Sequence, residues 1–248
     1  MKPELSIIIP CRNEIKRLPK TLEALAAIQV KNPCIEVVIV VEKGTDGTDT
    51  FAQEWARKHA PAKAVCNDIA KGKGYAVKTG MLAATGKIRM FMDADGAVPL
   101  STIETFLEVI YHHPPNTILI GSRQHPKSNI VFAQPAARVI SGRLFNLCMR
   151  LQGFTKSLDT QCGFKMLGAK MAEAIFSRTT DVGFGFDVEM LYIASQESAI
   201  IVELPVEWSD KPGSKVTAIS GGAKAFLYTS IICWTARIKK IIHNTSKK

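Results

Sequence analysis

The sequence lacks paired cysteines, long apolar runs and a high aromatic content, and each absence excludes a class of protein. The six cysteines are scattered and none forms a C-x-x-C pair, which argues against a zinc site and a disulfide framework. No stretch approaches the roughly 20 apolar residues of a membrane-spanning helix. The five histidines show no metal-ligand spacing and no serine or cysteine partner at a hydrolase motif.

The chain does carry a large excess of positive charge. Its 248 residues have a formal net charge of +10, which suggests an acidic partner: nucleic acid, an anionic membrane surface or a phosphorylated substrate. A hydrophobic content of 46% allows a sizeable core, in one large α/β domain or two small ones. The unpaired cysteines, and an apolar run at Leu5 with no signal peptide before it, predict a cytoplasmic protein.

Apolar runs of strand length alternate with segments of helical periodicity. The expected strands are 5–10, 35–41, 62–66, 87–93, 117–122 and 200–206, and residues 158–165 are expected to enter a further strand. The expected helices are 18–28, 49–59, 75–84, 100–112, 135–151, 169–176 and 187–196. This alternation predicts an α/β fold with a doubly wound, mostly parallel sheet, and leaves 123–134 and 207–216 as polar loops.

The expected strand at 87–93 ends on two acids, Asp93 and Asp95. The carboxyl edge of an open α/β sheet is where ligands bind. Two adjacent carboxylates suit Mg²⁺ or Mn²⁺, and Mg²⁺ usually binds one or two carboxylates together with substrate phosphates. The alternative is a solvated turn, with Asp95-Gly96 as ordinary turn chemistry.

Several basic residues are candidates for binding phosphate. Lys71-Gly-Lys-Gly74 opens a helix, where glycines allow close backbone approach and the helix amino terminus attracts anions. Arg123, Arg138 and Lys215 would form a phosphate cradle if the fold brings them together. The alternative for the glycine segment is a turn with two solvated lysines, and each of the other three cations can equally be a solvated surface residue.

Two features of the second half allow two interpretations each. Asp159 and Asp187 are either acids near the site or ordinary helix caps. Residues 223–242 are apolar at most positions and carry a basic flank that includes Arg237. This segment is either a core helix or an amphipathic helix lying on a membrane.

Seven motifs together resemble one enzyme family and span nearly the whole chain. They are Ile8-Ile-Pro-Cys-Arg-Asn-Glu14, Gly72-Lys-Gly74, Asp93-Ala-Asp-Gly-Ala97, Gly121-Ser-Arg123, Asp159-Thr-Gln-Cys-Gly-Phe-Lys165, Phe186-Asp-Val-Glu189 and Gly213-Ser-Lys-Val216. The chain resembles the inverting, GT-A-fold glycosyltransferases of family 2, and within them the polyprenyl-phosphate sugar synthases, especially dolichyl-phosphate glucosyltransferases. The motifs at 159–165 and 213–216 are the most specific and point to a lipid-phosphate acceptor.

The resemblance implies a role for each matching position. The nucleotide-sugar would be bound by Pro10, Arg12, Glu14, Glu42, Lys73, Asp93, Ala94, Asp95 and Lys215. Asp95 would be the direct ligand of Mg²⁺ or Mn²⁺, with Asp93 beside it. The acceptor phosphate would be held by Arg123, Arg138 and Ser214, so the catalytic set is Asp93, Asp95, Arg123 and Arg138.

The implied activity is metal-dependent transfer of glucose from UDP-glucose to a polyprenyl or dolichyl phosphate, by a peripheral protein on the cytoplasmic face of an anionic membrane. The expected domains are a transferase domain at 1–219, with a nucleotide-sugar half at 1–122 and an acceptor half at 123–219, and a C-terminal amphipathic helix at 220–248. Glu42-Lys-Gly-Thr45 is one residue shorter than the family's Asp-Asp-Gly-Ser stretch, and Arg12 stands where many relatives have an aromatic residue, so donor identity stays open.

The sequence leaves three other functions open, as well as a nonreactive relative, because of Glu42-Lys43. The same fold could use GDP-mannose as the donor, or a polysaccharide end as the acceptor. A basic nucleic-acid-binding protein is the non-enzyme alternative. Against that alternative, aromatic residues make up only 7% of the chain and no RNA-recognition signature is present, so we expect no nucleic-acid partner.

Overall fold

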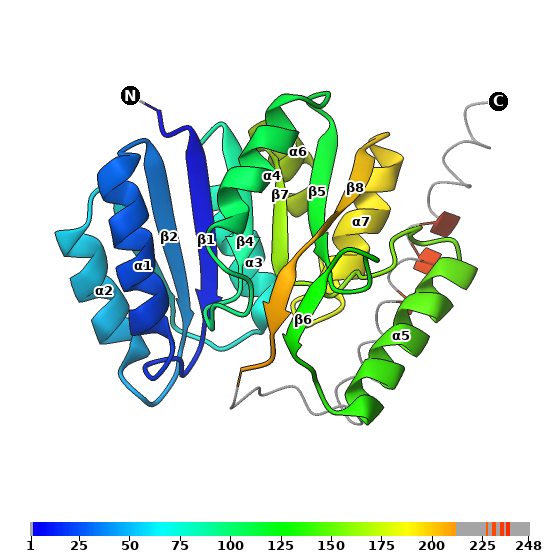
Figure 1. Cartoon of the computed structure of the whole chain (residues 1–248), viewed down its shortest axis with the longest axis horizontal. Coiled ribbons are helices and arrows are strands. Elements are labelled where there is room, and N and C mark those ends of the chain that lie inside the picture. The colour runs from blue at the N-terminus through cyan, green and yellow to red at the C-terminus, as the bar shows by residue number, and fades with distance from the viewer. Residues whose placement is uncertain (1, 212–226, 228–229, 232–233, 236, 239–248) are drawn as a thin grey trace.

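The computed structural model describes residues 2–211 and, beyond them, residues 227, 230–231, 234–235 and 237–238 (Figure 1). Ser214, Lys215 and most of the expected C-terminal helix at 220–248 therefore lie outside the described residues. Within the part of the chain that is described, no helix has the length and apolar character needed to cross a membrane.

A seven-stranded sheet forms the centre of the molecule, in the order β3-β2-β1-β4-β7-β5-β8. Its strands are β1 (Leu5–Cys11), β2 (Ile35–Glu42), β3 (Ala62–Asn67), β4 (Ile88–Met92), β5 (Thr117–Ser122), β7 (Phe164–Gly168) and β8 (Ile200–Pro205). β7 runs antiparallel to its neighbours β4 and β5, and every other pair in the sheet is parallel. The predicted doubly wound, mostly parallel sheet is confirmed.

Helices cover both faces of this sheet (Figure 1). One face carries α1 (Leu18–Lys31), α2 (Thr48–Lys58) and α4 (Thr102–Tyr111), and the other carries α3 (Lys73–Ala83), α6 (Ala169–Phe176) and α7 (Phe186–Gln196). In β1, Ile7 and Ile9 pack into the first layer while Ile8 packs into the second. β1 and β2 read as nearly continuous apolar runs because both of their faces are buried.

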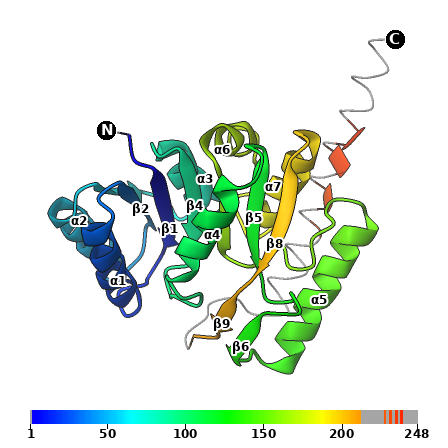
Figure 2. The ribbon, with the colours of Figure 1, turned by 45° about the horizontal axis from the view of Figure 1, so that its top comes forward.

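A second, two-stranded sheet lies beside the main one and leads into α5 (Ala136–Leu151) (Figure 2). It pairs β6 (Asn129–Phe132) with β9 (Glu207–Ser209) in parallel. The prediction of polar loops at 123–134 and 207–216 is therefore wrong where these strands lie. The strands are short and β6 is exposed, so no buried apolar run marked them in the sequence.

Candidate functional site

The predicted site residues that the structure describes gather around one edge of the main sheet. Parallel strands β1, β2, β4 and β5 all end there, and each is followed by a loop that carries candidate residues. β7 runs the other way, so the loop that enters it, residues 159–163, reaches the same edge. The Asp93 amide donates to the Gly163 carbonyl over 3.1 Å, which joins the two halves of the chain at this point.

Asp93 is held tightly at the end of β4. Lys73, the first residue of α3, places its Nζ 2.6 Å from Asp93 Oδ1. On the other side, a Cβ added to Gly163 would lie 2.1 Å from Asp93 Oδ2, so only glycine leaves room for the carboxylate. Burial opposes the charge of Lys73, but the nearby acids, Asp93 first, outweigh it and raise the pKa of Lys73.

The surroundings of Asp95 disfavour its charged form. Burial, followed by the charge of Asp93, raises the pKa of Asp95, although Arg17 NH1 lies 3.7 Å from its Oδ2. Among the described residues no group of three or more metal-ligating side chains exists, so this part of the chain offers two carboxylates here. That donor set fits a hard divalent cation whose other ligands are phosphate oxygens and water.

Glu42 shapes the loop that leads into α3. Its carboxylate is buried and accepts the amide hydrogens of Lys71 and Gly72, at 2.9 and 2.8 Å from Oε1. Gly72 has a φ of +126°, and a Cβ there would lie 2.4 Å from the Val182 carbonyl oxygen. Glu42 therefore ties the end of β2 to the backbone that aims Lys73 at Asp93.

The other donor-side candidates lie along the same edge. Pro10 is buried in β1 beside Val40 of β2. Arg12 is exposed and donates from Nε to the Lys43 carbonyl over 3.2 Å. Ala94 is buried, and its carbonyl accepts the hydroxyl of Thr21 at 2.9 Å.

Glu14 forms a close ion pair with Arg17, with 2.6 Å between Glu14 Oε1 and Arg17 NH2. Because Arg17 also approaches Asp95, it links the loop after β1 to the paired acids. Arg17 lies outside the sequence motifs that predicted this site. Its position three residues after Glu14, at the start of a helix, was the available signal.

Arg123 follows β5 and is fixed by a buried acid. Its Nε and NH2 donate to the two oxygens of Asp159 at 2.7 and 2.8 Å, and its guanidinium lies 5.5 Å from the centre of the Trp208 ring. Burial disfavours both charges, yet each ion offsets this for the other: the pKa of Asp159 is lowered and that of Arg123 raised. The pair presents a rigid guanidinium of the kind that binds phosphate.

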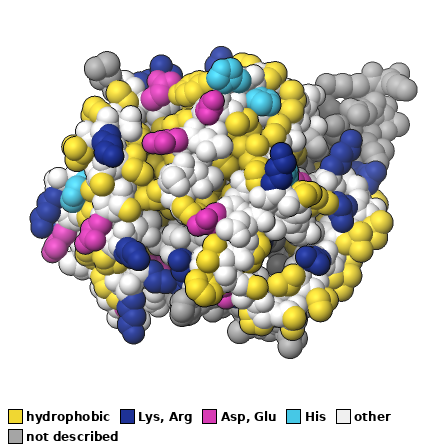
Figure 3. All heavy atoms as spheres, in the orientation of Figure 1, with side chains coloured by type: hydrophobic (Ala, Val, Ile, Leu, Met, Phe, Trp, Pro, Cys, Tyr) yellow, Lys and Arg dark blue, Asp and Glu magenta, His cyan; other side chains and the backbone are white. Residues whose placement is uncertain are grey.

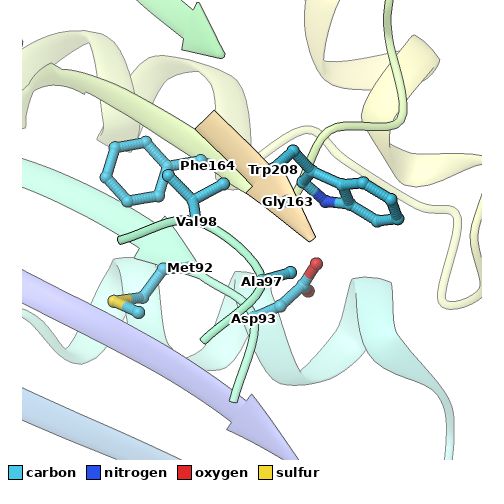
Figure 4. A pocket seen from close by; sticks show the side chains of 7 residues that line it. All are labelled: Met92, Asp93, Ala97, Val98, Gly163, Phe164 and Trp208. Atoms are coloured by element: carbon cyan, nitrogen blue, oxygen red, sulfur yellow. The ribbon is translucent and has the colours of Figure 1, made fainter. Parts of the chain in front are cut away.

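A small pocket lies beside Asp93 and Trp208. Figure 4 shows the Asp93 carboxylate pointing toward Trp208, the ring that contacts Arg123. The pocket is lined by Met92, Asp93, Ala97, Val98, Gly163, Phe164 and Trp208. Trp208 comes from β9, so its role in the site depends on strand pairing that the sequence did not reveal.

Arg138 approaches the same region from α5. Its NH1 lies 4.0 Å from Asp210 Oδ1, just after β9. The neighbouring Ser209 donates its amide to the Ala97 carbonyl over 3.0 Å, which ties β9 to the loop that carries Asp95. The two halves of the proposed cradle, Arg123 and Arg138, therefore both border β9 and its flanks.

Asp187 is not exposed at this edge. It is buried, with its Oδ1 2.5 Å from Lys165 Nζ, and Lys165 also donates to the Cys162 carbonyl at 2.7 Å. Burial raises the pKa of Asp187, and the two lysines Lys165 and Lys73 oppose the rise. Burial also raises the pKa of Cys162 to about 12, so this cysteine stays a neutral thiol.

Comparison with known proteins gives a consistent result. Residues 6–176 match the model of Glycosyl transferase family 2. The chain is 33% identical to a dolichyl-phosphate beta-glucosyltransferase of Drosophila melanogaster, over 86% of this chain and 69% of that protein. The Homo sapiens protein of the same name is 30% identical over the same shares.

Among solved structures, the fold is similar to that of glucosyl-3-phosphoglycerate synthase from Mycobacterium tuberculosis crystallised with Mn²⁺, UDP and glucosyl-3-phosphoglycerate. The TM-score is 0.66 at 15% identity, over 93% of this chain and 80% of that chain. At this identity the likeness concerns the fold, which is the GT-A arrangement that the motifs imply.

Proposed function

The chain belongs to glycosyl transferase family 2, and on that premise we propose that it moves glucose from UDP-glucose to the phosphate of a dolichyl or other polyprenyl phosphate. The observation that carries the proposal is that Asp93 and Trp208 line one small pocket and that Arg123 lies against the Trp208 ring. Paired acids suit a donor diphosphate with its cation, and a guanidinium suits an acceptor phosphate. The names of the similar fly and human enzymes support the choice of sugar and acceptor.

On the donor side, Asp95 and Asp93 would hold Mg²⁺ or Mn²⁺. When bound, the ion supplies positive charge against the diphosphate that leaves. Lys73 supplies a further, fixed positive charge, because its Nζ is already held 2.6 Å from Asp93 Oδ1. Charge that is fixed before reaction stabilises the developing negative charge without reorganisation. Lys215 and Ser214 stay predictions for this site.

On the acceptor side, the chemistry needs positioning more than a base. A phosphate monoester has its second pKa near about 6, so it is largely a dianion at neutral pH. One of its oxygens attacks the anomeric carbon while the bond from that carbon to the diphosphate breaks, and an α-linked donor gives a β-linked product. Arg123, held by Asp159, and Arg138 at the start of α5 would hold the phosphate in line.

A polyprenyl acceptor keeps its tail in a bilayer, so we propose that the protein works at the surface of a membrane, on its cytoplasmic face. The net charge of +10 favours an anionic surface.

The test is a transfer assay with the full chain, Mn²⁺ and a short, water-soluble prenyl phosphate. With UDP-glucose, mass spectrometry is expected to detect a glucosyl phosphoprenol. Faster product formation from GDP-mannose would overturn the choice of donor. Transfer to a polysaccharide, with none to the prenyl phosphate, would overturn the choice of acceptor.

Asp95→Asn tests the metal ligand in the same assay. It removes one of two carboxylates, so we expect a loss of rate of about 100-fold or more. Asp49→Asn removes an exposed acid in the first turn of α2 and is expected to leave the rate unchanged. Full activity in Asp95→Asn, with the same dependence on Mn²⁺, would show that Asp95 is not a ligand.

A further inference from the structure

One face of α5 exposes large apolar side chains along its length. Ile140, Leu144, Leu147 and Leu151 are 65%, 58%, 42% and 78% exposed. Their spacing places them in one stripe, because residues three and four apart lie on the same side of a helix. β6, just before α5, adds Val131 and Phe132 at 48% and 66%. We call these six residues the α5 face.

The α5 face is not the side by which the helix packs on the protein. That side carries Met149, which is buried against Phe154, Val188 and Tyr192. In Figure 3, apolar side chains extend along the outer edge of α5, with Lys and Arg side chains next to them. A contiguous apolar surface on a folded domain usually marks a place where another molecule binds.

The charge around the α5 face identifies the kind of partner. Residues 124–158 contain no Asp or Glu, while their basic residues are Lys127, Arg138, Arg143, Arg150 and Lys156. Elsewhere on the surface the two signs are mixed, as in α2, which carries Asp49 and Glu54 as well as Arg57 and Lys58. Glu207 and Asp210, on β9 and just after it, are the acids beside this segment. An apolar stripe on a segment whose own charges are all positive is complementary to an anionic lipid surface, with apolar groups below the headgroups and cations among them.

We propose that the α5 face docks on an anionic lipid bilayer and so brings the acceptor site to the membrane, an inference that rests on the lipid-linked acceptor proposed above. Arg138 lies in the first turn of α5, so the acceptor cradle adjoins the docked surface. A lipid phosphate can then reach Arg138 and Arg123 while its tail stays in the bilayer.

The described residues near the C-terminus lie next to this surface. Trp234 Nε1 donates to Gln152 Oε1 at 3.0 Å, one residue beyond the carboxyl end of α5. Ile231 and Ile238 are 54% and 52% exposed. The sequence left the C-terminal segment as either a core helix or an amphipathic helix lying on a membrane, whereas the proposal assigns the main membrane contact to the α5 face.

The experiment is co-sedimentation of the full chain with vesicles of phosphatidylcholine, alone or with about 30% phosphatidylglycerol. We expect the wild type to bind the anionic vesicles more strongly. Leu151→Glu places a charge in the exposed apolar stripe and should weaken binding about tenfold or more. Val30→Glu is the matched control, because Val30 is 85% exposed on α1 and should bind as the wild type does.

A second pair of variants tests the charge. Arg143→Glu on α5 should weaken binding to anionic vesicles, whereas Lys58→Glu at the end of α2 should not. Equal binding of the wild type to both vesicle types would overturn the anionic partner.

Two outcomes would overturn this inference, and one control measurement excludes misfolding. Normal binding by Leu151→Glu, with loss in Ile238→Glu, would move the contact to the C-terminal segment and overturn the proposal. A wild-type dimer that Leu151→Glu converts to a monomer, with vesicle binding unchanged, would make the α5 face a self-association surface and also overturn it. Leu151→Glu should keep its rate on the soluble prenyl phosphate without vesicles, which excludes misfolding.

The vesicle assay does not depend on catalysis. If the wild type transfers sugar to no prenyl phosphate, the proposed function fails, while vesicle binding by the α5 face still decides whether this surface docks on lipid.

Discussion

The proposed donor side of the candidate site and the α5 face are built in opposite ways. On the donor side, charged groups are buried and held by partners, as in the 2.6 Å contact between Lys73 and Asp93 and the amides that Glu42 accepts. The α5 face instead has side chains that are 42–78% exposed, in a stretch without acids. Charges that are fixed in place stabilise the negative charge of a diphosphate without reorganisation. A bilayer is fluid, and apolar area and net charge are enough to bind it.

If rigidity matters on the donor side, Gly163→Ala should have the largest effect. The new methyl group would lie 2.1 Å from Asp93 Oδ2, so either the carboxylate or the loop 159–163 has to move. Misplacing a binding group by about 1 Å can cost about 100-fold in rate, and we expect a loss of that size in kcat/KM.

The matched control for Gly163→Ala is Gly142→Ala in α5. A Cβ at Gly142 meets nothing within 4 Å, and alanine favours the helix by about 0.5–1 kcal/mol. Transfer to the soluble acceptor should be unchanged and thermal stability slightly raised. Equal loss of activity in both variants would contradict the contrast between a rigid donor side and a tolerant α5.

The next largest effect is expected for Arg123→Lys, which keeps the charge and removes the planar fork. The Arg123 guanidinium donates two parallel hydrogen bonds to Asp159 and still has a planar edge free for phosphate. The single ammonium group of lysine cannot do both. Charged hydrogen bonds are worth about 1.5–3 kcal/mol, which corresponds to a loss of about 10- to 100-fold in kcat/KM for the acceptor. Arg178→Lys, at an exposed ion pair with Glu197, is the control that should show no change.

Arg123→Lys should act on the acceptor and leave the donor alone. Binding of UDP, followed by thermal shift, is therefore expected to match the wild type. A loss of UDP binding equal to the loss in rate would place Arg123 on the donor side.

A smaller effect is expected when Glu42→Gln loosens the loop before α3. A glutamine amide has one acceptor oxygen and places an NH₂ group where the carboxylate now accepts backbone hydrogens. Losing about one hydrogen bond should weaken binding of UDP-glucose about tenfold, measured by calorimetry.

Glu36→Gln provides the contrast on the same strand. Glu36 is buried near the other end of β2, where it accepts the Ser6 hydroxyl and the Thr85 amide at 2.5 and 2.8 Å. This change should lower the melting temperature and leave UDP-glucose binding intact. If both variants lower stability equally and neither weakens binding, Glu42 is a structural residue only.

The residues proposed for the donor side could be predicted from the sequence because their signals are local. The strand that ends at Asp93, the glycines before Lys73 and the order of strands and helices can all be read within short windows. A parallel strand buried on both faces is a continuous apolar run, and the acids that follow it lie at the carboxyl edge by geometry.

The parts that were missed depend on contacts between distant segments. Trp208 reaches the pocket because β9 pairs with β6, and the Val206 carbonyl accepts the Asn129 amide at 3.1 Å from a segment far away in the chain. Hydrophobic periodicity reports which side of a segment is buried, and it does not report which segment covers it. For the same reason, the paired hydrogen bonds between Arg123 and Asp159 could not be predicted from the motif at 121–123 or the motif at 159–165 alone.

The smallest expected effect concerns the stability of the folded protein and involves the buried carboxyl group of Asp181. Asp181 lies in the loop whose Val182 and Gly183 carbonyls accept the amides of Tyr75 and Gly74 and so brace the start of α3. Burial raises the pKa of Asp181 to about 6, and its Oδ2 has no hydrogen-bond partner within the described chain. In the unfolded chain this carboxyl has a pKa of about 4. Between about pH 4 and pH 6 the folded state therefore binds more protons than the unfolded state, and the folded state loses stability as pH rises.

Asp181→Asn removes this titration. The variant should be more stable than the wild type above about pH 7, by roughly 1–3 kcal/mol, and the gain should shrink as pH falls through about 6 toward 4. Urea unfolding at several pH values measures the difference, and Asp49→Asn controls for the loss of one exposed negative charge. A gain that stays constant across this range would mean that the buried charge is not its cause. Unchanged UDP-glucose binding would then show that the loop braces α3 through its backbone carbonyls, independently of the acid.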